Sequence, residues 1–410
     1  MKRLLAVSWE MPPMYGPRGT QVSRTLRELA ALDWRPLAVC LAPHAFGAHW
    51  RDGVPVDAPA GVELIRVSSP EEWTAVRAAW RIAPPLRDYP DSTRVWVGRA
   101  AAAAVGAARA HQCQGLITFA QPWSDHLVGL RVSRATGLPW VAHFSDPWAD
   151  SPYATTRQRA IWRRMEARVV REAAGLVFVT AETADLVMAK YPGAWRNKVS
   201  VVPHGYDARR LQPPVTPPDP KRKMRLLYSG RFYAGVRTPL ALLRALRDWI
   251  HRNGTSDALE VIFVGPHVEE FERDAAAMGL QSMVTFRGRV SPEEAAREAE
   301  CADALLVIDA PSEGPSVFLP SKLVEYLPLR KPIIGVTPEP GAASALLRRL
   351  GCPVAPPGDV AAIVSMLDGV VARWRAGELA IGDAFDAVAA EFDIKRTTAR
   401  LHEALTRAFA

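Results

Sequence analysis

Cysteine is scarce in this sequence, and several familiar sequence signatures are missing from it. The 410 residues include four cysteines, which are far apart and form no Cys-x-x-Cys pair, so neither structural zinc nor a disulfide framework is indicated. The Gly-x-Gly-x-x-Gly fingerprint is absent, which disfavours a dinucleotide cofactor. No Asp-x-Asp motif occurs either, so a diphosphate bridged by a metal ion is not indicated, and no metal site is expected.

Long apolar runs are also lacking. No segment approaches the roughly 18 uninterrupted apolar residues that a membrane-spanning helix needs. Lys2 and Arg3 precede only about five apolar residues before Glu10, which is too short for a signal peptide. We therefore expect a cytoplasmic protein, with peripheral contact to the inner membrane face as an open alternative.

Negative charge is under-represented in the first half of the chain. Up to Arg210 there are 27 Lys and Arg against 18 Asp and Glu, whereas the remainder has 24 against 25. The excess of positive charge favours an anionic partner for the first half, such as an acidic glycan, a lipid phosphate or a membrane surface. Arginine outnumbers lysine, and no basic stretch is interleaved with aromatic residues, so a nucleic-acid partner is not expected.

The length and the order of apolar runs predict two domains. A chain of 410 residues exceeds one ordinary core, and its composition, 49% hydrophobic and 23% charged, is that of a globular protein. Buried-type strands alternate with helices in both halves, which predicts two doubly wound, Rossmann-like α/β domains. The expected parts are a first domain over 1–207, a proline-rich linker over 208–222, a second domain over 223–392 and a final helix over 393–410. Such a pair of domains predicts a cleft between them.

The first strand leads into a loop rich in glycine and proline. Leu4–Ser8 is apolar, and residues 10–20 hold Gly16 and Gly19 before an amphipathic helix begins. Glycines at this place let the backbone approach a ligand at the carboxyl end of the strand. Arg18, between the two glycines, is a candidate cation, although a turn without function remains the alternative.

A second candidate stretch lies in the other half. The apolar run Ala304–Ile308 predicts a buried strand, and a short helix is predicted to open near Ser321. The free amides of a first helical turn suit an anion, and Lys322 stands in that turn. Glu325 follows one turn later on the same face, where a carboxylate suits a pair of sugar hydroxyls. A capped, solvated helix end is the alternative.

These residues resemble a known pattern. The chain looks like a GT-B-fold glycosyltransferase, and it is similar to the retaining family-four (group 1) enzymes that use nucleotide sugars. The resemblance covers nearly the whole length and rests on six motifs in order: Pro12-Pro-x-x-Gly16, Ser145-Asp-Pro-Trp148, Val202-Pro-His-Gly-Tyr-Asp207, Gly230-Arg231 with Arg237, Gly288 with Pro292, and Pro320-Ser-Lys-x-x-Glu-Tyr326. It implies the GT-B arrangement of domains, with the last helix crossing back to the first domain.

The resemblance implies roles for residues of the second half. Arg231 and Arg237 match the Arg and Lys that clasp the donor diphosphate, with Arg in place of the usual Lys. Glu325 matches the residue that holds the ribose hydroxyls. The family's preceding Glu falls at Val317, where this chain has none. The donor-binding set implied here is Gly230, Gly288, Ser316, Val317, Phe318, Ser321, Lys322 and Glu325.

In the first half, the resemblance places Gly16 and Gly19 in the loop that closes over the diphosphate. The family often has a His where this chain has Ser145, and His143 is expected on the other face of its strand. Asp146 therefore becomes the candidate polar group near the anomeric carbon or the acceptor hydroxyl. There a carboxylate takes a proton or stabilises positive charge.

The implied activity is transfer of a sugar from a nucleoside-diphosphate sugar, with retention and without a cofactor or metal. The acceptor is expected to be a growing polysaccharide, a lipid-linked saccharide or a small molecule. Two alternatives stay open: a nucleotide-sugar epimerase or hydrolase on the same fold, and a catalytically silent protein that binds nucleotide sugars. The departures at Val317 and Ser145 make the silent protein plausible.

Overall fold

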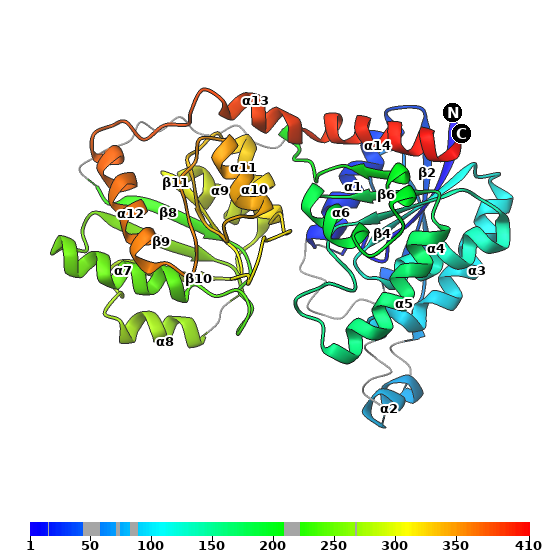
Figure 1. Cartoon of the computed structure of the whole chain (residues 1–410), viewed down its shortest axis with the longest axis horizontal. Helices are drawn as coiled ribbons and strands as arrows, with labels where there is room; N and C mark the ends of the chain where they lie inside the picture. Colours follow the sequence, from blue (N-terminus) through cyan, green and yellow to red (C-terminus); the bar gives the residue numbers. More distant parts are fainter. Residues whose placement is uncertain (15, 44–57, 71–73, 83–88, 209–221, 267–268) are drawn as a thin grey trace. The chain divides into compact units, whose positions relative to one another are not determined.

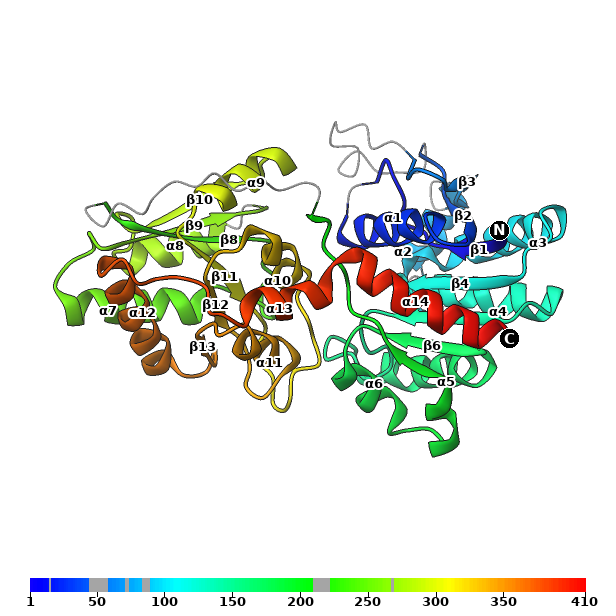
Figure 2. The same ribbon diagram turned by 90° about the horizontal axis from the view of Figure 1, so that it is seen from above.

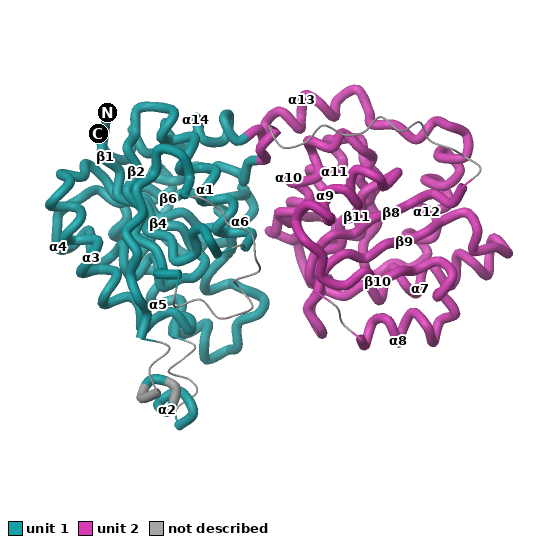
Figure 3. The backbone as a smooth tube through the Cα atoms, turned by 180° about the vertical axis from the view of Figure 1, so that it is seen from behind, with its two compact units in different colours: residues 1–205, 394–410 teal, residues 206–393 magenta. Residues whose placement is uncertain are grey.

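The computed structural model describes residues 1–14, 16–43, 58–70, 74–82, 89–208, 222–266 and 269–410. The chain forms two compact units (Figure 3). Unit 1 consists of Met1–Gly205 together with Ile394–Ala410, and unit 2 is Tyr206–Asp393. Most of the expected linker, residues 209–221, lies outside the described residues.

A seven-stranded parallel sheet forms the centre of unit 1 (Figure 1). Its strand order is β3-β2-β1-β4-β5-β6-β7, so the order reverses between β1 and β4. The strands are β1 (Lys2–Val7), β2 (Trp34–Leu41), β3 (Glu63–Val67), β4 (Gly115–Ala120), β5 (Trp140–Phe144), β6 (Gly175–Phe178) and β7 (Val199–Val201). Every residue of β4, β5 and β6 is buried, as expected for strands covered on both faces.

Helices cover both faces of this sheet. One face carries α1 (Pro17–Ala30) and α14 (Ile394–Phe409), which lie side by side (Figure 2). The other face carries α3 (Val97–Ala110), α4 (Ser124–Thr136), α5 (Thr156–Glu172) and α6 (Ala181–Met188). The described part of unit 1 also contains α2 (Thr74–Ile82) and the short 3-10 helices η5 (Ser92–Trp96) and η6 (Gly193–Lys198). The sequence predicted little structure between residues 43 and 95 apart from one strand, so α2 and η5 are additions.

The last helix belongs to unit 1, although unit 2 precedes it in the chain. Leu401 and Leu405 of α14 are at most 1% exposed and join the core beneath α1. The indole nitrogen of Trp34 donates a hydrogen bond of 2.9 Å to His402 Nδ1, and its ring meets Phe409 edge to face. The helix that was expected to return to the first domain is therefore part of that domain's core.

Unit 2 repeats the same design with a six-stranded parallel sheet. Its order is β10-β9-β8-β11-β12-β13, and the reversal falls between β8 and β11. The strands are β8 (Met224–Ser229), β9 (Leu259–Val264), β10 (Val284–Gly288), β11 (Ala304–Ile308), β12 (Ile333–Val336) and β13 (Val354–Ala355). In doubly wound sheets, ligands bind at the carboxyl ends of the strands where the order reverses.

The helices of unit 2 also form two layers. One face carries α7 (Leu240–Asn253), α8 (Glu269–Ala277) and α12 (Val360–Arg375). The other carries α9 (Pro292–Cys301), α10 (Ser321–Tyr326), α11 (Ala342–Arg349) and α13 (Phe385–Ala389), with 3-10 turns η8 (Leu327–Leu329) and η9 (Ala390–Phe392). The run Ser291-Pro-Glu-Glu294 predicts a helix start with Ser as the cap, and the structure confirms it, because the side chains of Ser291 and Glu294 form a reciprocal capping box.

None of the helices in the described residues is long and apolar enough to cross a membrane.

Candidate functional site

The loop after β1 folds back on itself at the carboxyl edge of the unit 1 sheet. Gly16 precedes α1 with an extended backbone, and Gly19 lies buried in the first turn. The Gly19 amide donates a hydrogen bond of 3.3 Å to Glu10 Oε2. A Cβ on Gly19 would stand 3.2 Å from the carbonyl oxygen of Met14, so the turn leaves little room for a side chain.

Arg18 lies half-buried in the same first turn. Its guanidinium makes no hydrogen bond or ion pair with any residue that the structure describes. Burial lowers the pKa of Arg18, while the carboxyl groups of Asp146, Glu10 and Asp125 act to raise it. Arg18 and Asp146, both predicted from the sequence, therefore lie within one electrostatic cluster.

Three carboxyl groups complete this cluster. Asp125, at the start of α4, is fully buried and accepts a 2.9 Å hydrogen bond from the backbone amide of Trp9. Its second oxygen has no partner among the described residues. Asp146, in the turn after β5, accepts a 3.2 Å hydrogen bond from Gln121 Nε2. Burial raises the pKa of Glu10, of Asp125 and of Asp146, and Arg18 lowers each.

The sequence did not single out Glu10 or Asp125. Glu10 opens the predicted glycine loop, and Asp125 opens the helix after β4. Because β1 and β4 flank the reversal of strand order, their carboxyl ends meet at one point of the sheet edge. Knowing the strand order would have identified both residues.

Two histidines accompany the carboxyl groups. His143 of β5 is buried, and its ring lies 6.2 Å from that of His204, which follows β7. Burial, and secondly the charge of Arg18, lower the pKa of His143 to about 3. The same two causes, with His143 added, lower the pKa of His204. His143, expected on the other face of its strand, lies in the field of Arg18 and so belongs to the same electrostatic cluster.

Replacing His143 by glutamine is expected to flatten the acid side of the stability curve. Its pKa is about 3 in the folded chain, against an ordinary value of 6.5. Between these values the unfolded chain binds a proton that the folded chain does not. The free energy of unfolding therefore falls as pH drops below 6.5, by about 1.4 kcal/mol per pH unit. Denaturant unfolding measures the free energy of unfolding at pH 7 and at pH 5. Between these two values, wild-type protein is expected to lose about 2 kcal/mol more than His143→Gln.

Wild type must be compared with His143→Gln, because the raised pKa values of Glu10, Asp125 and Asp146 make the folded chain more stable as pH falls, which opposes the effect of His143. His251→Gln, at an exposed position of α7, is the matched control and is expected to keep the wild-type slope. Equal slopes for wild type and His143→Gln would contradict the buried, neutral state of His143.

In unit 2, three glycines meet where β8, β9 and β10 end. The Gly230 amide donates to Val264 O at 2.8 Å, and the Gly265 amide donates to Gly288 O at 2.9 Å. A Cβ on Gly265 would lie 1.9 Å from Gly230 O, so only glycine fits there. Gly288 has a φ of 70°, which also favours glycine. Together with four phenylalanines they line a small hollow: Phe232, Phe263, Phe271 and Phe286.

The two predicted arginines stand in the loop beside this hollow. Arg237 Nη2 donates a 2.9 Å hydrogen bond to the carbonyl oxygen of Arg231, and its guanidinium lies over the Tyr233 ring at 5.1 Å. The Arg237 Nε is buried without a partner among the described residues. The side chain of Arg231 is exposed and bonds to none of them. Both arginines thus keep donors available for an anion.

The stretch after β11 reaches the same edge. Ser316 is buried and fixed by its backbone, which bonds to Pro340 O and to the Ala342 amide. The helix α10 begins at Ser321, as predicted. The hydroxyl of Tyr326 accepts a 2.9 Å hydrogen bond from the Ser229 amide and so ties α10 to the end of β8.

Within each unit, the predicted residues follow strands that end at the same edge of the sheet. Val317, Phe318, Ser321 and Glu325 are half-buried, and Lys322 is exposed. The loop bearing Gly230, Arg231 and Arg237 follows β8, whereas the stretch 316–325 follows β11, the other strand at the reversal. In unit 1, Gly16, Arg18, Gly19 and Asp146 follow β1 and β5 at the corresponding edge.

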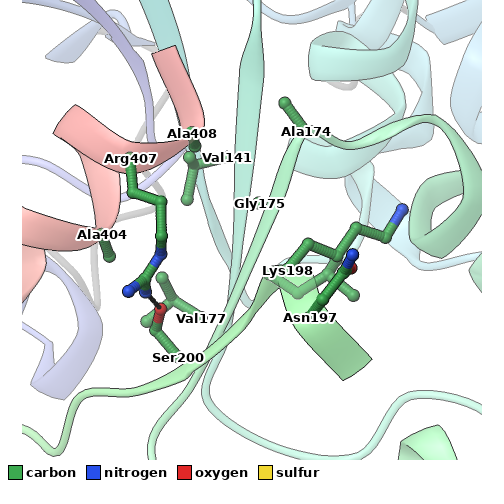
Figure 4. A pocket seen from close by; sticks show the side chains of 11 residues that line it. Val141, Ala174, Gly175, Val177, Asn197, Lys198, Ser200, Ala404, Arg407 and Ala408 are labelled. Atoms are coloured by element: carbon green, nitrogen blue, oxygen red, sulfur yellow. Dashed lines mark hydrogen bonds between the residues drawn. The ribbon is translucent and has the colours of Figure 1, made fainter. Parts of the chain in front are cut away.

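A larger hollow of about 280 Å³ lies elsewhere in unit 1, between α14 and strands β5 to β7 (Figure 4). Arg407 donates a 2.7 Å hydrogen bond to Ser200 Oγ, and Lys198 donates to the carbonyl oxygens of Arg171 and Ala173. None of the residues predicted from the sequence lines it. Arg407 and Lys198, the cationic residues of this hollow, already donate hydrogen bonds to neighbouring groups of the chain.

Comparison with known proteins gives a fold match without a sequence match. No protein-family model matches the chain, and no curated protein sequence matches it. Among solved structures, a sucrose-phosphate synthase from Thermosynechococcus elongatus has a TM-score of 0.71 at 14% identity, covering 98% of both chains. A glycosyltransferase from Rickettsia africae has a TM-score of 0.66 at 12% identity, covering 99% of this chain and 98% of its own.

An α,α-trehalose-phosphate synthase from Burkholderia xenovorans, in complex with glucose-6-phosphate, has a TM-score of 0.64 at 10% identity and covers 99% of this chain and 100% of its own. These neighbours are GT-B glycosyltransferases, matched over nearly their whole length. The chain has their two-domain, Rossmann-like GT-B fold.

Proposed function

We propose that the protein is a glycosyltransferase that moves a sugar from a nucleoside-diphosphate sugar to a saccharide, lipid-linked or small-molecule acceptor. The observation that carries this proposal is the position of Arg231 and Arg237. They follow β8 at the reversal of the unit 2 sheet, beside the close approach of Gly230 and Gly265, with guanidinium donors available. An open α/β sheet binds its ligand at this place, and guanidinium groups suit a diphosphate.

The proposed roles of the donor-site residues follow from the charge that develops when the bond between the sugar and the diphosphate breaks. Negative charge grows on the diphosphate as the sugar leaves, and fixed cations stabilise that charge. Arg231 and Arg237 take this role, with Lys322 and the amides near Ser321 as further donors. Glu325 holds the ribose hydroxyls, and the backbone at Ser316, Val317 and Phe318 lies along the sugar. The sequence has no Asp-x-Asp, so we propose transfer that needs no metal.

Unit 1 would bind the acceptor. The resemblance to retaining enzymes supports retention of the anomeric configuration, with Gly16, Gly19 and Arg18 toward the diphosphate and Asp146 at the acceptor hydroxyl. Burial raises the pKa of Asp146, which makes its carboxylate a stronger base than an exposed one. The Burkholderia neighbour was solved with a sugar phosphate, which supports a saccharide acceptor in general. We place the reaction in the cytoplasm, in polysaccharide or glycoconjugate biosynthesis.

A thermal-shift screen tests donor binding. A ligand present at 100 times its Kd adds about 2.7 kcal/mol to stability, so nucleoside diphosphates and their sugars are expected to raise Tm measurably. Uncharged nucleosides are expected to give little, because they lack the diphosphate. The absence of a shift with every common nucleoside diphosphate would contradict the proposal.

Product analysis separates the two alternatives. A glycoside that forms only with an acceptor supports the transferase, and its anomeric signal in NMR reports retention. An epimer or free sugar formed without an acceptor would assign the chain to an epimerase or hydrolase. Tight donor binding without turnover on a broad acceptor panel would assign it to a silent binding protein.

A further inference from the structure

Arginine side chains cover the outer surface of three neighbouring helices of unit 1. α3 packs against α4, α4 packs against α5, and the side chains that they bury belong to one core cluster. Ten arginines on these helices are exposed, and we call them the arginine face: Arg99, Arg109, Arg131, Arg134, Arg157, Arg159, Arg163, Arg164, Arg168 and Arg171.

The three helices that carry the arginine face contribute almost no exposed negative charge of their own. The structure describes every residue of the three helices, and α3 contains no acidic residue. Asp125 of α4 and Glu166 of α5 are fully buried. The side chain of Glu172 is 23% exposed and is shared by Arg134 and Arg171. Apart from Arg99, which also donates to Ser68 Oγ, the other arginines form a positive surface to which these three helices add no further carboxylate.

The distribution of these charges favours a lipid surface over a chain-like polyanion. The arginines spread across three helices, and neither of the two hollows described above is lined by any of them. A single-stranded nucleic acid needs a groove with aromatic side chains on which bases stack. Instead, an amphipathic ring stands beside the N-terminus of α5: Tyr153, 56% exposed. Tyrosine is typical of the boundary between headgroups and acyl chains.

We propose that the arginine face binds the anionic surface of a lipid bilayer. Guanidinium groups bind phosphate with paired hydrogen bonds, and anionic leaflets attract clustered basic residues. Ten exposed arginines on one side of the unit supply the multiple weak contacts that such binding requires. The inference does not depend on the proposed glycosyl transfer, because it uses none of the residues assigned to that reaction.

Vesicle co-sedimentation of the full chain tests the proposal. Wild-type protein is expected to sediment with vesicles of equal parts phosphatidylglycerol and phosphatidylcholine, and to stay in solution with phosphatidylcholine alone. Each basic residue near an anionic surface contributes about fivefold in partitioning. The combined variant Arg163→Gln, Arg164→Gln, Arg168→Gln is therefore expected to partition about a hundredfold more weakly. High salt is expected to release wild-type protein, because it screens exposed charges.

The matched control removes three exposed arginines from helices of unit 2, as Arg244→Gln, Arg273→Gln, Arg297→Gln, and is expected to sediment like wild type. Glutamine and arginine have similar helix propensities, so an unchanged thermal transition verifies that both variants fold. Equal sedimentation of wild type and the α5 variant would overturn the proposal. So would wild-type protein that binds single-stranded DNA but not the anionic vesicles, which would assign the face to a nucleic acid.

Discussion

Replacing Arg231 by alanine is expected to weaken the binding of a nucleoside diphosphate by about thirtyfold to a hundredfold. A hydrogen bond to a charged group contributes about 1.5–3 kcal/mol, and thirtyfold to hundredfold corresponds to about 2–2.7 kcal/mol, which lies within that range. The Arg231 side chain bonds to no described residue, so its loss should leave the fold intact. Titration calorimetry with a nucleoside diphosphate measures the change.

Arg244→Ala is the matched control, because Arg244 is exposed on α7 and lies outside the loop at residues 230–237. It is expected to keep the wild-type Kd and Tm. If Arg231→Ala also kept the wild-type Kd, the diphosphate would have to bind elsewhere. If the variant lost Tm without ligand, the residue would be structural instead.

Arg237 is expected to respond differently from Arg231. One of its nitrogens holds the Arg231 carbonyl oxygen while its Nε stays unpaired, so the planar group can serve the loop and a ligand together. A lysine ammonium is a compact point charge and lacks the planar fork that reaches two separate acceptors from different nitrogens. Arg237→Lys is therefore expected to keep part of the diphosphate affinity but to loosen the loop at residues 231–237, which hydrogen exchange of that segment reports.

Replacing Asp146 by asparagine is expected to lower kcat by about a hundredfold to ten-thousandfold, the usual contribution of a positioned acid or base. Donor affinity should stay within about threefold of wild type, because Asp146 and the donor arginines belong to different units. Asparagine preserves the shape and can still accept from Gln121, so the loss would report the charge. Steady-state kinetics with the acceptor found by product analysis measures both quantities.

The pH dependence gives a second readout for Asp146. A base must be deprotonated, and burial raises the pKa of this carboxyl group, so kcat is expected to fall as pH drops through that raised value. The acid limb should disappear in Asp146→Asn. Asp185→Asn, at an exposed position of α6, is the control and should retain both the rate and the limb. A wild-type kcat in Asp146→Asn would remove the residue from the mechanism.

The parts predicted best were those set by local patterns. Continuous apolar runs identified the buried strands, and Ser291 with Glu294 marked a helix start that the structure confirms. The start of α10 at Ser321 follows from the proline before it and from the apolar strand upstream. These signals arise from burial and capping, which act over a few residues.

The parts that the sequence did not yield depend on distant contacts. α11 was not predicted, because Ala342–Arg349 is short and comes soon after a strand. Glu10 and Asp125 are 115 residues apart in the sequence, and both reach the site because β1 and β4 are neighbouring strands. The sequence gives no sign that His143 lies in the field of Arg18, because the two residues are 125 positions apart and come near each other only in the fold.

The membership of α14 in unit 1 has a consequence for synthesis on the ribosome. The first 205 residues leave the tunnel long before Leu401 and Leu405, whose side chains close the core beneath α1. Unit 1 must therefore wait, incompletely sealed, until the whole of unit 2 has been translated. Apolar surface that waits exposed invites aggregation, so a nascent chain of this protein is a natural client for chaperones.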